Sequence, residues 1–372
     1  MRICILTQPL EMNYGGILQA YALQKALTEM GHEVTTLRFK PLYAQASSRA
    51  EMYWKIFRRF LSKMKGNKAI LFSNPEKQWE HYRKMNREIE RFISENINFL
   101  EADIPLNANK LPVFDAYIVG SDQVWRPVFS PHLPDFYLGF LEDERPLRIA
   151  FAASFGVDGW ESSEKETALL RKLAQRFDRI SVREASGVEL CRNHLGMDAE
   201  LMPDPTMLLT REDYLTLCPS PVSGIPDQPY IATYIIDPDN KIGTLISDFA
   251  ERSHLPVVSV GGFDWERGSK PMEHWLAGIA NARFVITDSF HGTVFSLLFQ
   301  KDFITFINGW RGPSRYHTLL DTFGLSNRLV CADQASEIEI PPLDNKVVSQ
   351  ILPALRERGL SFLAKATSIK RP

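Results

Sequence analysis

A chain of 372 residues is too long for one ordinary hydrophobic core, so we expect two domains. Its composition, 44% hydrophobic and 24% charged, is typical of a globular protein, and its net charge of −2 argues against broad nucleic-acid binding. The four cysteines lie far apart without metal-binding spacing, which argues against a disulfide framework and fits a reducing compartment.

The N-terminal ten residues lack a basic start and a long apolar stretch, so we expect no signal peptide. No apolar run reaches the length of a membrane span. These features predict a cytoplasmic protein.

The first forty residues predict a βαβ unit. Residues 2–7 are expected to form a buried strand, residues 13–31 a helix that begins at an Asn-Tyr-Gly-Gly turn, and residues 33–39 a second strand. The chain contains no G-x-G-x-x-G and no G-x-x-x-x-G-K-[ST] motif, so the usual dinucleotide and phosphate signatures are missing. The turn fits a ligand cleft and fits a plain tight turn equally well. Its candidate binding residues are Asn13, Tyr14 and Gly16.

Residues 52–64 differ from the rest because apolar and aromatic side chains form one helical stripe and basic side chains cover most of the remainder. A basic amphipathic helix of this kind can make peripheral contact with an anionic membrane. The same pattern equally fits an insertion that packs on its own domain. A second helix, at about 76–96, has balanced charge, so we expect a helical insertion at about 45–100.

Polar turns follow two further predicted strands of the first domain. The turn after residues 114–119 suits a sugar, because carboxylate and amide groups bind hydroxyls and an indole ring can cover the apolar face of a pyranose. Its candidate residues are Ser121, Asp122, Gln123 and Trp125. The strand at 179–182 is followed by Arg183, which either points into a crevice or forms a surface ion pair with an acid such as Glu184.

A segment rich in proline, serine and glycine at 218–227 is the best linker in the chain. It separates an N-terminal domain, 1–218, from a C-terminal domain, 228–344, in which the alternation of strands and helices restarts. The remaining segment, 345–372, contains a last helix that we expect to pack back across the linker.

The strongest candidate site is the strand, turn and helix at 283–299. A polar turn at the carboxyl end of a strand, followed by a helix N-terminus, is a place where α/β proteins bind anions. His291 lies in the first helical turn and can change charge near neutral pH, although a capped helix with a packed histidine fits the same pattern. The candidate binding residues are Asp288, Ser289, His291 and Gly292.

Two more arginines, Arg311 and Arg315, fall between a predicted strand and the next helix. Arginine binds carboxylate or phosphate through two parallel hydrogen bonds. Together with Arg183 and His291, they suit a small and strongly anionic ligand, whereas the Asp122 turn suits a hydroxyl-rich one. A cleft with one side suited to an anion and another suited to hydroxyl groups implies group transfer to a carbohydrate.

Several motifs occur in one order and spacing: 13–16, 120–125, 181–184, 204–206, 273–276 and 287–292, with Arg311 and Arg315 after them. Over nearly the whole chain they resemble the polysaccharide pyruvyl transferase family. The resemblance implies an α/β fold with two Rossmann-like domains facing a central cleft, similar to GT-B glycosyltransferases. It also implies transfer of the pyruvyl group of phosphoenolpyruvate to a sugar, usually as a ketal across O4 and O6 of a galactose-type residue.

The resemblance also implies roles for particular residues. The family holds the donor at the positions of Arg183 and His291, and members can carry an arginine two residues before that histidine, where this chain has Ser289. We therefore expect Arg311 or Arg315 to supply the missing charge. His291 is the expected general acid, charged mainly when donor is bound, and Asp122 is expected to position or deprotonate the acceptor hydroxyl. The scheme needs no metal and no cofactor.

Acceptors of bacterial capsule and exopolysaccharide assembly are often carried on a lipid diphosphate. A lipid-linked acceptor would give residues 52–64 a role in holding the enzyme at the cytoplasmic leaflet. A GT-B glycosyltransferase that uses a nucleotide sugar is the nearest alternative, but it would need a base and ribose pocket for which the sequence offers no clear candidate. A non-catalytic sugar-binding protein would need Asp122 and Trp125 but not the cluster of arginines and histidine.

Overall fold

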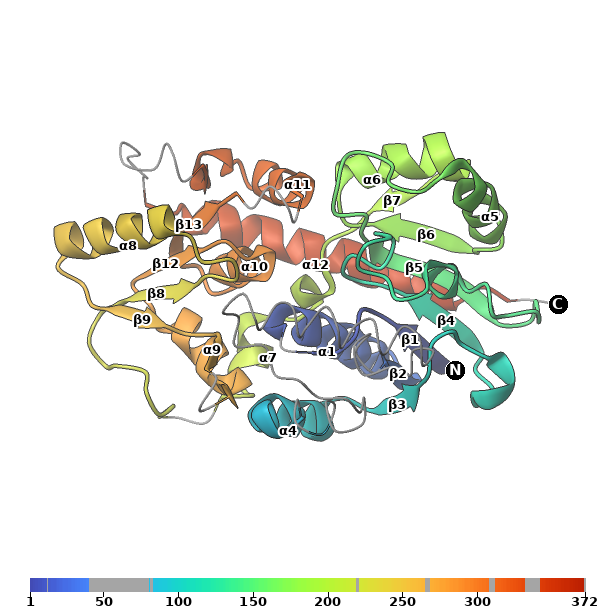
Figure 1. Cartoon of the computed structure of the whole chain (residues 1–372), viewed down its shortest axis with the longest axis horizontal. Coiled ribbons are helices and arrows are strands. Elements are labelled where there is room, and N and C mark those ends of the chain that lie inside the picture. The colour runs from blue at the N-terminus through green and yellow to red at the C-terminus, as the bar shows by residue number, and fades with distance from the viewer. Residues whose placement is uncertain are drawn as a thin grey trace, which may run out of the picture.

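The computed structural model describes residues 1–11, 13–39, 80, 83–218, 221–264, 268–307, 312–331 and 342–370. Within these residues the chain forms two parallel sheets that lie beside each other, each covered by helices (Figure 1). The basic segment 52–64 and Arg311 fall outside the described residues.

The N-terminal sheet has seven parallel strands in the order β3-β2-β1-β4-β5-β6-β7. The central strands β1 and β4 are almost entirely apolar and buried, as expected for strands covered on both faces. The strand order reverses between β1 and β4, which makes this the topological switch point of the sheet. The strands are β1 Arg2–Leu6, β2 Glu33–Phe39, β3 Phe99–Ala102, β4 Ala116–Val119, β5 Leu147–Ala153, β6 Arg179–Val182 and β7 Glu200–Leu201.

The helix α1, Tyr14–Glu29, connects the first sheet to the second half of the molecule. Its last turns bury Leu23 and Leu27 against β1, whereas its first turns bury Ile17 and Leu18 in an apolar cluster shared with the C-terminal domain. Being apolar on both sides, the helix can fill the space between the two domains. The other helices of this half are α4 Arg87–Asn96, α5 Glu164–Ala174, α6 Ala185–Leu190 and α7 Arg211–Leu215.

The C-terminal sheet has five parallel strands in the order β14-β13-β12-β8-β9, and its order reverses between β8 and β12. A small antiparallel pair, β10 and β11, lies in the connection after β9. The strands are β8 Ile231–Tyr234, β9 Val257–Ser259, β10 Phe263–Asp264, β11 Gly268–Ser269, β12 Phe284–Thr287, β13 Asp302–Phe306 and β14 Leu329–Val330. The helices are α8 Asn240–Ser253, α9 Met272–Ala280, α10 Phe290–Leu298 and α11 Ser314–Thr322.

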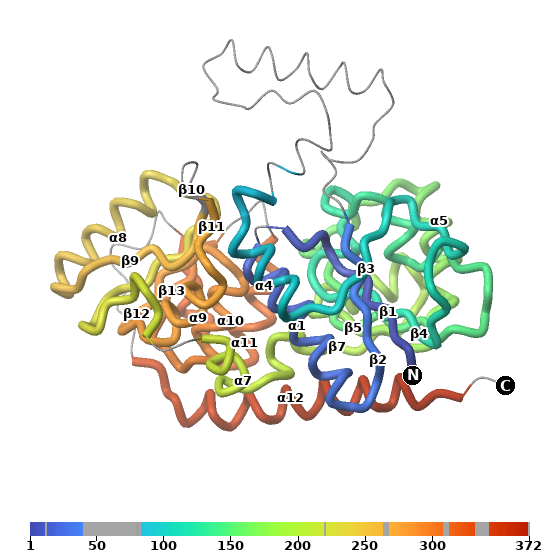
Figure 2. The backbone as a smooth tube through the Cα atoms, turned by 90° about the horizontal axis from the view of Figure 1, so that it is seen from below, coloured from blue at the N-terminus to red at the C-terminus, as the bar shows by residue number. Residues whose placement is uncertain are grey.

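The last helix, α12 Asn345–Thr367, runs beneath both halves of the molecule (Figure 2). Near its start, Val348 and Leu355 pack in the apolar cluster that contains the C-terminal domain core. Near its end, Phe362 and Leu363 pack against the underside of the first sheet. The Arg356 Nε donates to the Leu208 carbonyl at 2.8 Å. This helix and α1 therefore hold the two domains together, with their switch points on the cleft between them.

Candidate active site

A cavity of about 300 Å³ lies between the domains, where both switch points meet. Ligands of α/β sheets bind outside the carboxyl ends of the strands at such points. The N-terminal wall comes mainly from the loops that follow β1 and β4, and it includes Gln8, Glu11, Asn13, Asp122 and Gln123. The C-terminal wall comes from the segments after β8 and β12 and from the start of α11, and it includes Ile236, Ser289, Phe290, His291, Arg315 and Tyr316.

His291 is positioned by two helices. Strand β12 ends at Thr287, and Ser289 then caps α10 by accepting a hydrogen bond from the Gly292 N–H at 3.3 Å. The imidazole lies against the start of α1, where a Cβ on Gly15 would be only 2.0 Å from the His291 Cγ. Glycine at position 15 is therefore needed for the close approach of α1 to the ring.

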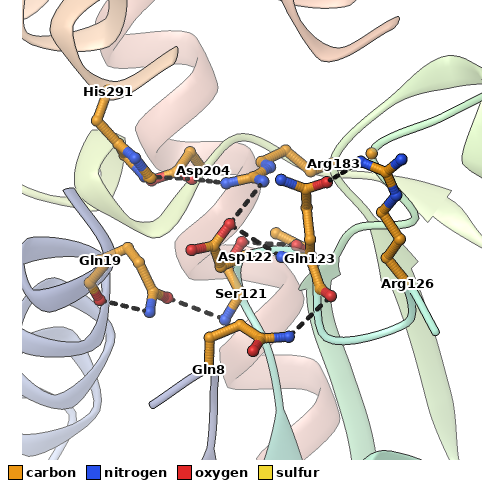
Figure 3. A network of polar contacts seen from close by, with 12 residues as sticks. Gln8, Gln19, Ser121, Asp122, Gln123, Arg126, Arg183, Asp204 and His291 are labelled. Atoms are coloured by element: carbon orange, nitrogen blue, oxygen red, sulfur yellow. Dashed lines mark hydrogen bonds and ion pairs between the residues drawn. The ribbon is translucent and has the colours of Figure 1, made fainter. Parts of the chain in front are cut away.

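Asp204 stands between His291 and Arg183 in a buried cluster (Figure 3). Its Oδ2 lies 2.6 Å from the Arg183 Nη1 and 3.4 Å from the His291 Nε2. Its Oδ1 accepts from the N–H and the hydroxyl of Thr206, at 3.0 and 2.7 Å. Burial opposes ionisation of this carboxyl, but the nearby His291 and Arg183 outweigh it and hold the pKa of Asp204 below its usual range.

Arg183 is neutralised on both sides. Besides Asp204, its Nη2 lies 3.4 Å from the Asp122 Oδ1, and its guanidinium sits over the Phe290 ring at 4.6 Å from the centroid. Burial would raise the pKa of Asp122, but Arg183 leads the charges that lower it instead. Arg183 is thus part of a buried ion-pair network and does not form a surface pair with Glu184. The Glu184 carboxylate instead accepts hydrogen bonds from the Phe155 and Gly156 N–H groups.

Arg315 differs from Arg183 in having no carboxylate partner among the described residues. Its side chain is only 5% exposed, and its Nε has no hydrogen-bond acceptor within the same part of the chain. The guanidinium is held over the rings of Phe290 and Tyr316, at 5.2 and 5.4 Å from their centroids. Burial lowers the pKa of Arg315, yet arginine remains charged in proteins. Asp122 and Glu184 act on this cation only through longer-range charge interactions, so an anionic ligand in direct contact would compensate its burial further.

Three helix N-termini adjoin the cavity, because Asn13, Ser289 and Arg315 lie at the starts of α1, α10 and α11 and line its walls. In the described structure neither α1 nor α11 has a side-chain cap on its first N–H groups. Unpaired N–H groups and the positive ends of helix dipoles favour an anion. The Ser314 hydroxyl, at the start of α11, is also buried and without a partner in the described chain.

The acceptor residues expected from the sequence are only partly in the cavity. Asn13, Asp122 and Gln123 line it. The prediction for Trp125 is wrong, since the indole is 1% exposed, donates to the Phe136 carbonyl at 2.9 Å and stacks in the domain core. The loop after β4 carries this side chain inward, so neither ring face is open to a sugar.

Three other candidates on the acceptor side also have structural roles. Ser121 is fully buried and donates to the Ala152 carbonyl at 2.6 Å, while Gly16 is buried inside α1. Tyr14 does not line this cavity; its hydroxyl donates to the Lys270 carbonyl at 2.9 Å, its ring stacks on Trp275, and it lines a neighbouring cavity together with Ile236 and Lys270. The predictions of direct acceptor contact are therefore wrong for Ser121 and Gly16, and that for Tyr14 stays a prediction.

On the donor side, Ser289, His291 and Arg315 line the cavity, and Arg183 lies behind it. The prediction that Asp288 contacts the donor is wrong, because its carboxylate accepts from the Ile236 and Asp237 N–H groups at 2.7 and 2.9 Å. Asp288 thus ties the loop after β8 to the loop after β12. Gly292 also has a packing role, since a Cβ there would lie 2.3 Å from the Thr287 Oγ1.

Sequence reasoning missed Asp204 and Glu11 as site residues. Asp204 stood in a recognised motif, but nothing in the pattern indicated that it would join Arg183 to His291. Glu11 lies in the loop after β1 and lines the cavity. The switch-point rule applied to the first strand would have indicated this loop.

The described residues contain no cluster of three side chains suited to bind a metal ion. Nor does any helix in the described segments combine the length and apolar character needed to cross a bilayer.

Similar solved structures include a UDP-GlcNAc 2-epimerase from Methanocaldococcus jannaschii, with 12% identity, a TM-score of 0.47 and coverage of 96% of this chain and 100% of that one. MurG from Acinetobacter baumannii has 9% identity and a TM-score of 0.39, with coverage of 100% and 96%. The comparison with curated protein sequences found no match. A family model, polysaccharide pyruvyl transferase, matches residues 13–309, which is most of the chain. The matched range includes the described segments that line the cavity, except for most of the loop after β1 and the start of α11. The chain therefore belongs to the polysaccharide pyruvyl transferase family.

Proposed function

We propose that this pyruvyl transferase moves the pyruvyl group of phosphoenolpyruvate onto a hexose of a bacterial polysaccharide or of its lipid-linked precursor. The expected product is a 4,6-ketal of galactose. The observation that carries the proposal is Arg315, a buried guanidinium with no carboxylate partner among the described residues, which lines the same interdomain cavity as His291. Phosphoenolpyruvate is a small donor with roughly three negative charges, since the second pKa of its phosphate is about 6.

The donor is proposed to lie on the C-terminal wall. Arg315 and the N–H groups at the starts of α10 and α11 would bind its phosphate or carboxylate, which explains how a chain with Ser289 before its histidine can still hold a trianion. Arg311 remains a candidate for the same task. Arg183 contributes through the ion pairs that fix Asp204 and Asp122 around His291.

His291 is proposed as the general acid. A bound trianion stabilises the protonated ring, as does the Asp204 carboxylate 3.4 Å from its Nε2, so the donor complex would hold the proton that His291 gives. Transfer of that proton to the methylene carbon creates an oxocarbenium-like centre at C2, which one sugar hydroxyl attacks. Phosphate leaves, and the second hydroxyl closes the ketal. Asp122, ion-paired with Arg183 and exposed to the cavity edge, is suited to position the acceptor by accepting a hydroxyl hydrogen bond.

Thermal-shift measurements separate this proposal from a glycosyltransferase. Phosphoenolpyruvate should raise the melting temperature, whereas UDP- and GDP-sugars should not, because only a ligand of the native state stabilises it. Stabilisation by a nucleotide sugar alone would favour the glycosyltransferase. Mass spectrometry of a lipid-linked galactoside incubated with phosphoenolpyruvate then tests the product and the acceptor.

The membrane part of the proposal concerns residues 52–64. If this segment holds the enzyme at the cytoplasmic leaflet, the protein should sediment with anionic vesicles more than with neutral ones. Changing its lysines and arginines to glutamate should abolish that preference. Equal binding to both kinds of vesicle would remove the membrane role without affecting the catalytic proposal.

A further inference from the structure

The two carboxyl groups on the N-terminal wall of the cavity, those of Asp122 and Glu11, have different electrostatic environments. Asp122 is held by Arg183, which stabilises its ionised form and weakens it as a proton acceptor. Glu11, in the loop between β1 and α1, lines the same cavity and has no hydrogen-bond or ion-pair partner among the described residues. A half-buried carboxyl without a partner, on the wall opposite an acid and a cation, needs an explanation.

The C-terminal wall, opposite Glu11, indicates which substrate would lie between the two walls. The other titratable or charged side chains that line this cavity are Asp122, His291, Arg315 and Tyr316. His291 and Arg315 lie on the C-terminal wall, where the anionic donor is proposed to bind, so a hydroxyl-bearing acceptor would fill the space between that wall and Glu11.

We propose that Glu11 is the general base that takes the proton from the acceptor hydroxyl as it attacks C2 of the donor. This inference rests on the proposed pyruvyl transfer and assigns to Glu11 a task that Asp122, fixed in its ion pair, is poorly suited to perform.

The proton balance of the reaction supports a separate base. His291 gives a proton to the methylene carbon, the first hydroxyl oxygen bonds to C2, and the hydroxyl proton passes to Glu11. The C2–O bond to phosphate then breaks, and phosphate leaves with the electron pair and the proton from Glu11. The second hydroxyl bonds to C2 and its proton restores His291. One donor trianion and one diol thus give one ketal carboxylate and one hydrogen phosphate dianion.

The environment of Glu11 suits both halves of this role. Burial raises the pKa of Glu11 from its ordinary value of 4.5 to about 7. A group with a pKa near the working pH can accept a proton in one step and return it in the next. In the described structure no positive charge offsets this burial, in contrast to Asp122.

The test compares the wild type with Glu11→Gln, Glu11→Asp and the control Glu33→Gln, which removes an exposed carboxylate at the start of β2. Ketal formation from phosphoenolpyruvate and p-nitrophenyl β-galactoside is followed by mass spectrometry from pH 5 to 9, and donor affinity is measured by calorimetry. General-base removal typically costs about 10²- to 10⁴-fold. Glu11→Gln should lose kcat by that factor and lose the acid limb of the pH profile, with the donor Kd changed less than about twofold.

Glu11→Asp should retain an acid limb and part of the rate, because it keeps a carboxylate, and Glu33→Gln should behave as the wild type. If Glu11→Gln keeps the wild-type kcat and acid limb, or if donor affinity falls as much as kcat, Glu11 is not the base. Failure of the wild type to form ketal is a different result. It rejects transfer to this galactoside, and the base assignment falls with it.

Discussion

The two walls of the interdomain cavity differ in the charged groups that they present. The C-terminal wall presents His291, the N-termini of α10 and α11, and Arg315, which has no carboxylate partner in the described part of the chain, and so it accumulates positive potential. The N-terminal wall presents carboxyl and amide groups, and an ion pair joins its Asp122 to Arg183, which lies behind the cavity. If the donor binds the C-terminal wall and the acceptor binds the N-terminal wall, as proposed, changes on one wall should affect one substrate.

His291→Ala is the change with the largest expected effect. It removes the proposed proton donor, and turnover should fall by at least about 10³-fold, near the upper range for general acid removal. His317→Ala, which removes an exposed imidazole from α11, should leave the rate unchanged. Activity assays of both variants check the pair, and a His291→Ala enzyme with wild-type turnover would remove the proposed site.

The two arginines should respond in opposite ways when they are replaced in the unliganded protein. Arg183→Met removes the cation that is paired with the buried carboxylates of Asp204 and Asp122, and breaking a buried pair costs about 3–5 kcal/mol. Arg315→Met removes a buried cation that has no described counter-ion, so its stability should be equal to or above that of the wild type. Urea denaturation measures both, and equal destabilisation would mean that Arg315 is paired in solution.

Gly15→Ala tests the contact between the walls. The added methyl group would occupy the space of the His291 ring, so the ring must move. A displacement of about 1 Å can cost about 10²-fold in rate. Gly243→Ala is the matched helical control, because a Cβ there meets nothing within 4 Å, and it should gain roughly 0.5–1 kcal/mol of stability with no loss of activity. Equal activity of the two variants would contradict the close packing on His291.

The stability of Glu11→Gln should depend on pH. The folded protein holds the pKa of Glu11 at about 7, above its ordinary value of 4.5, so ionisation in the folded state is penalised. The penalty is absent below pH 4.5, grows as the pH rises to 7 and is constant above that. Glu11→Gln removes it, and denaturation should show a gain on the order of 2 kcal/mol at pH 8 that disappears near pH 4.5. A gain of equal size at both pH values would contradict the raised pKa.

The rule that ligands of α/β proteins bind beyond the carboxyl ends of the strands predicted much of the site from the sequence. Asp122, Arg183, His291 and Arg315 all follow predicted strands or begin the next helix, and the structure brings them together. The rule failed where the direction of a side chain decided the outcome. Trp125 follows a strand but turns into the core, and Asp288 binds backbone N–H groups.

Partners across the cluster could not be predicted for a physical reason. Asp204 meets Arg183 and His291 only because the turn after β7, the end of β6 and the start of α10 converge in three dimensions. Local patterns carry no information on such pairing. Glu11 was overlooked because a single glutamate in a loop belongs to no motif, although its position after the first strand places it at the switch point.

Calorimetric titration of phosphoenolpyruvate into the wild type and into Arg315→Met tests the central claim most directly. We expect the wild type to bind the donor and Arg315→Met to lose at least about tenfold in affinity, since a charged hydrogen bond contributes roughly 1.5–3 kcal/mol. Asn13→Ala, which changes the opposite wall, should bind the donor as the wild type does. Equal affinity of the wild type and Arg315→Met would contradict the assignment of the C-terminal wall to the donor.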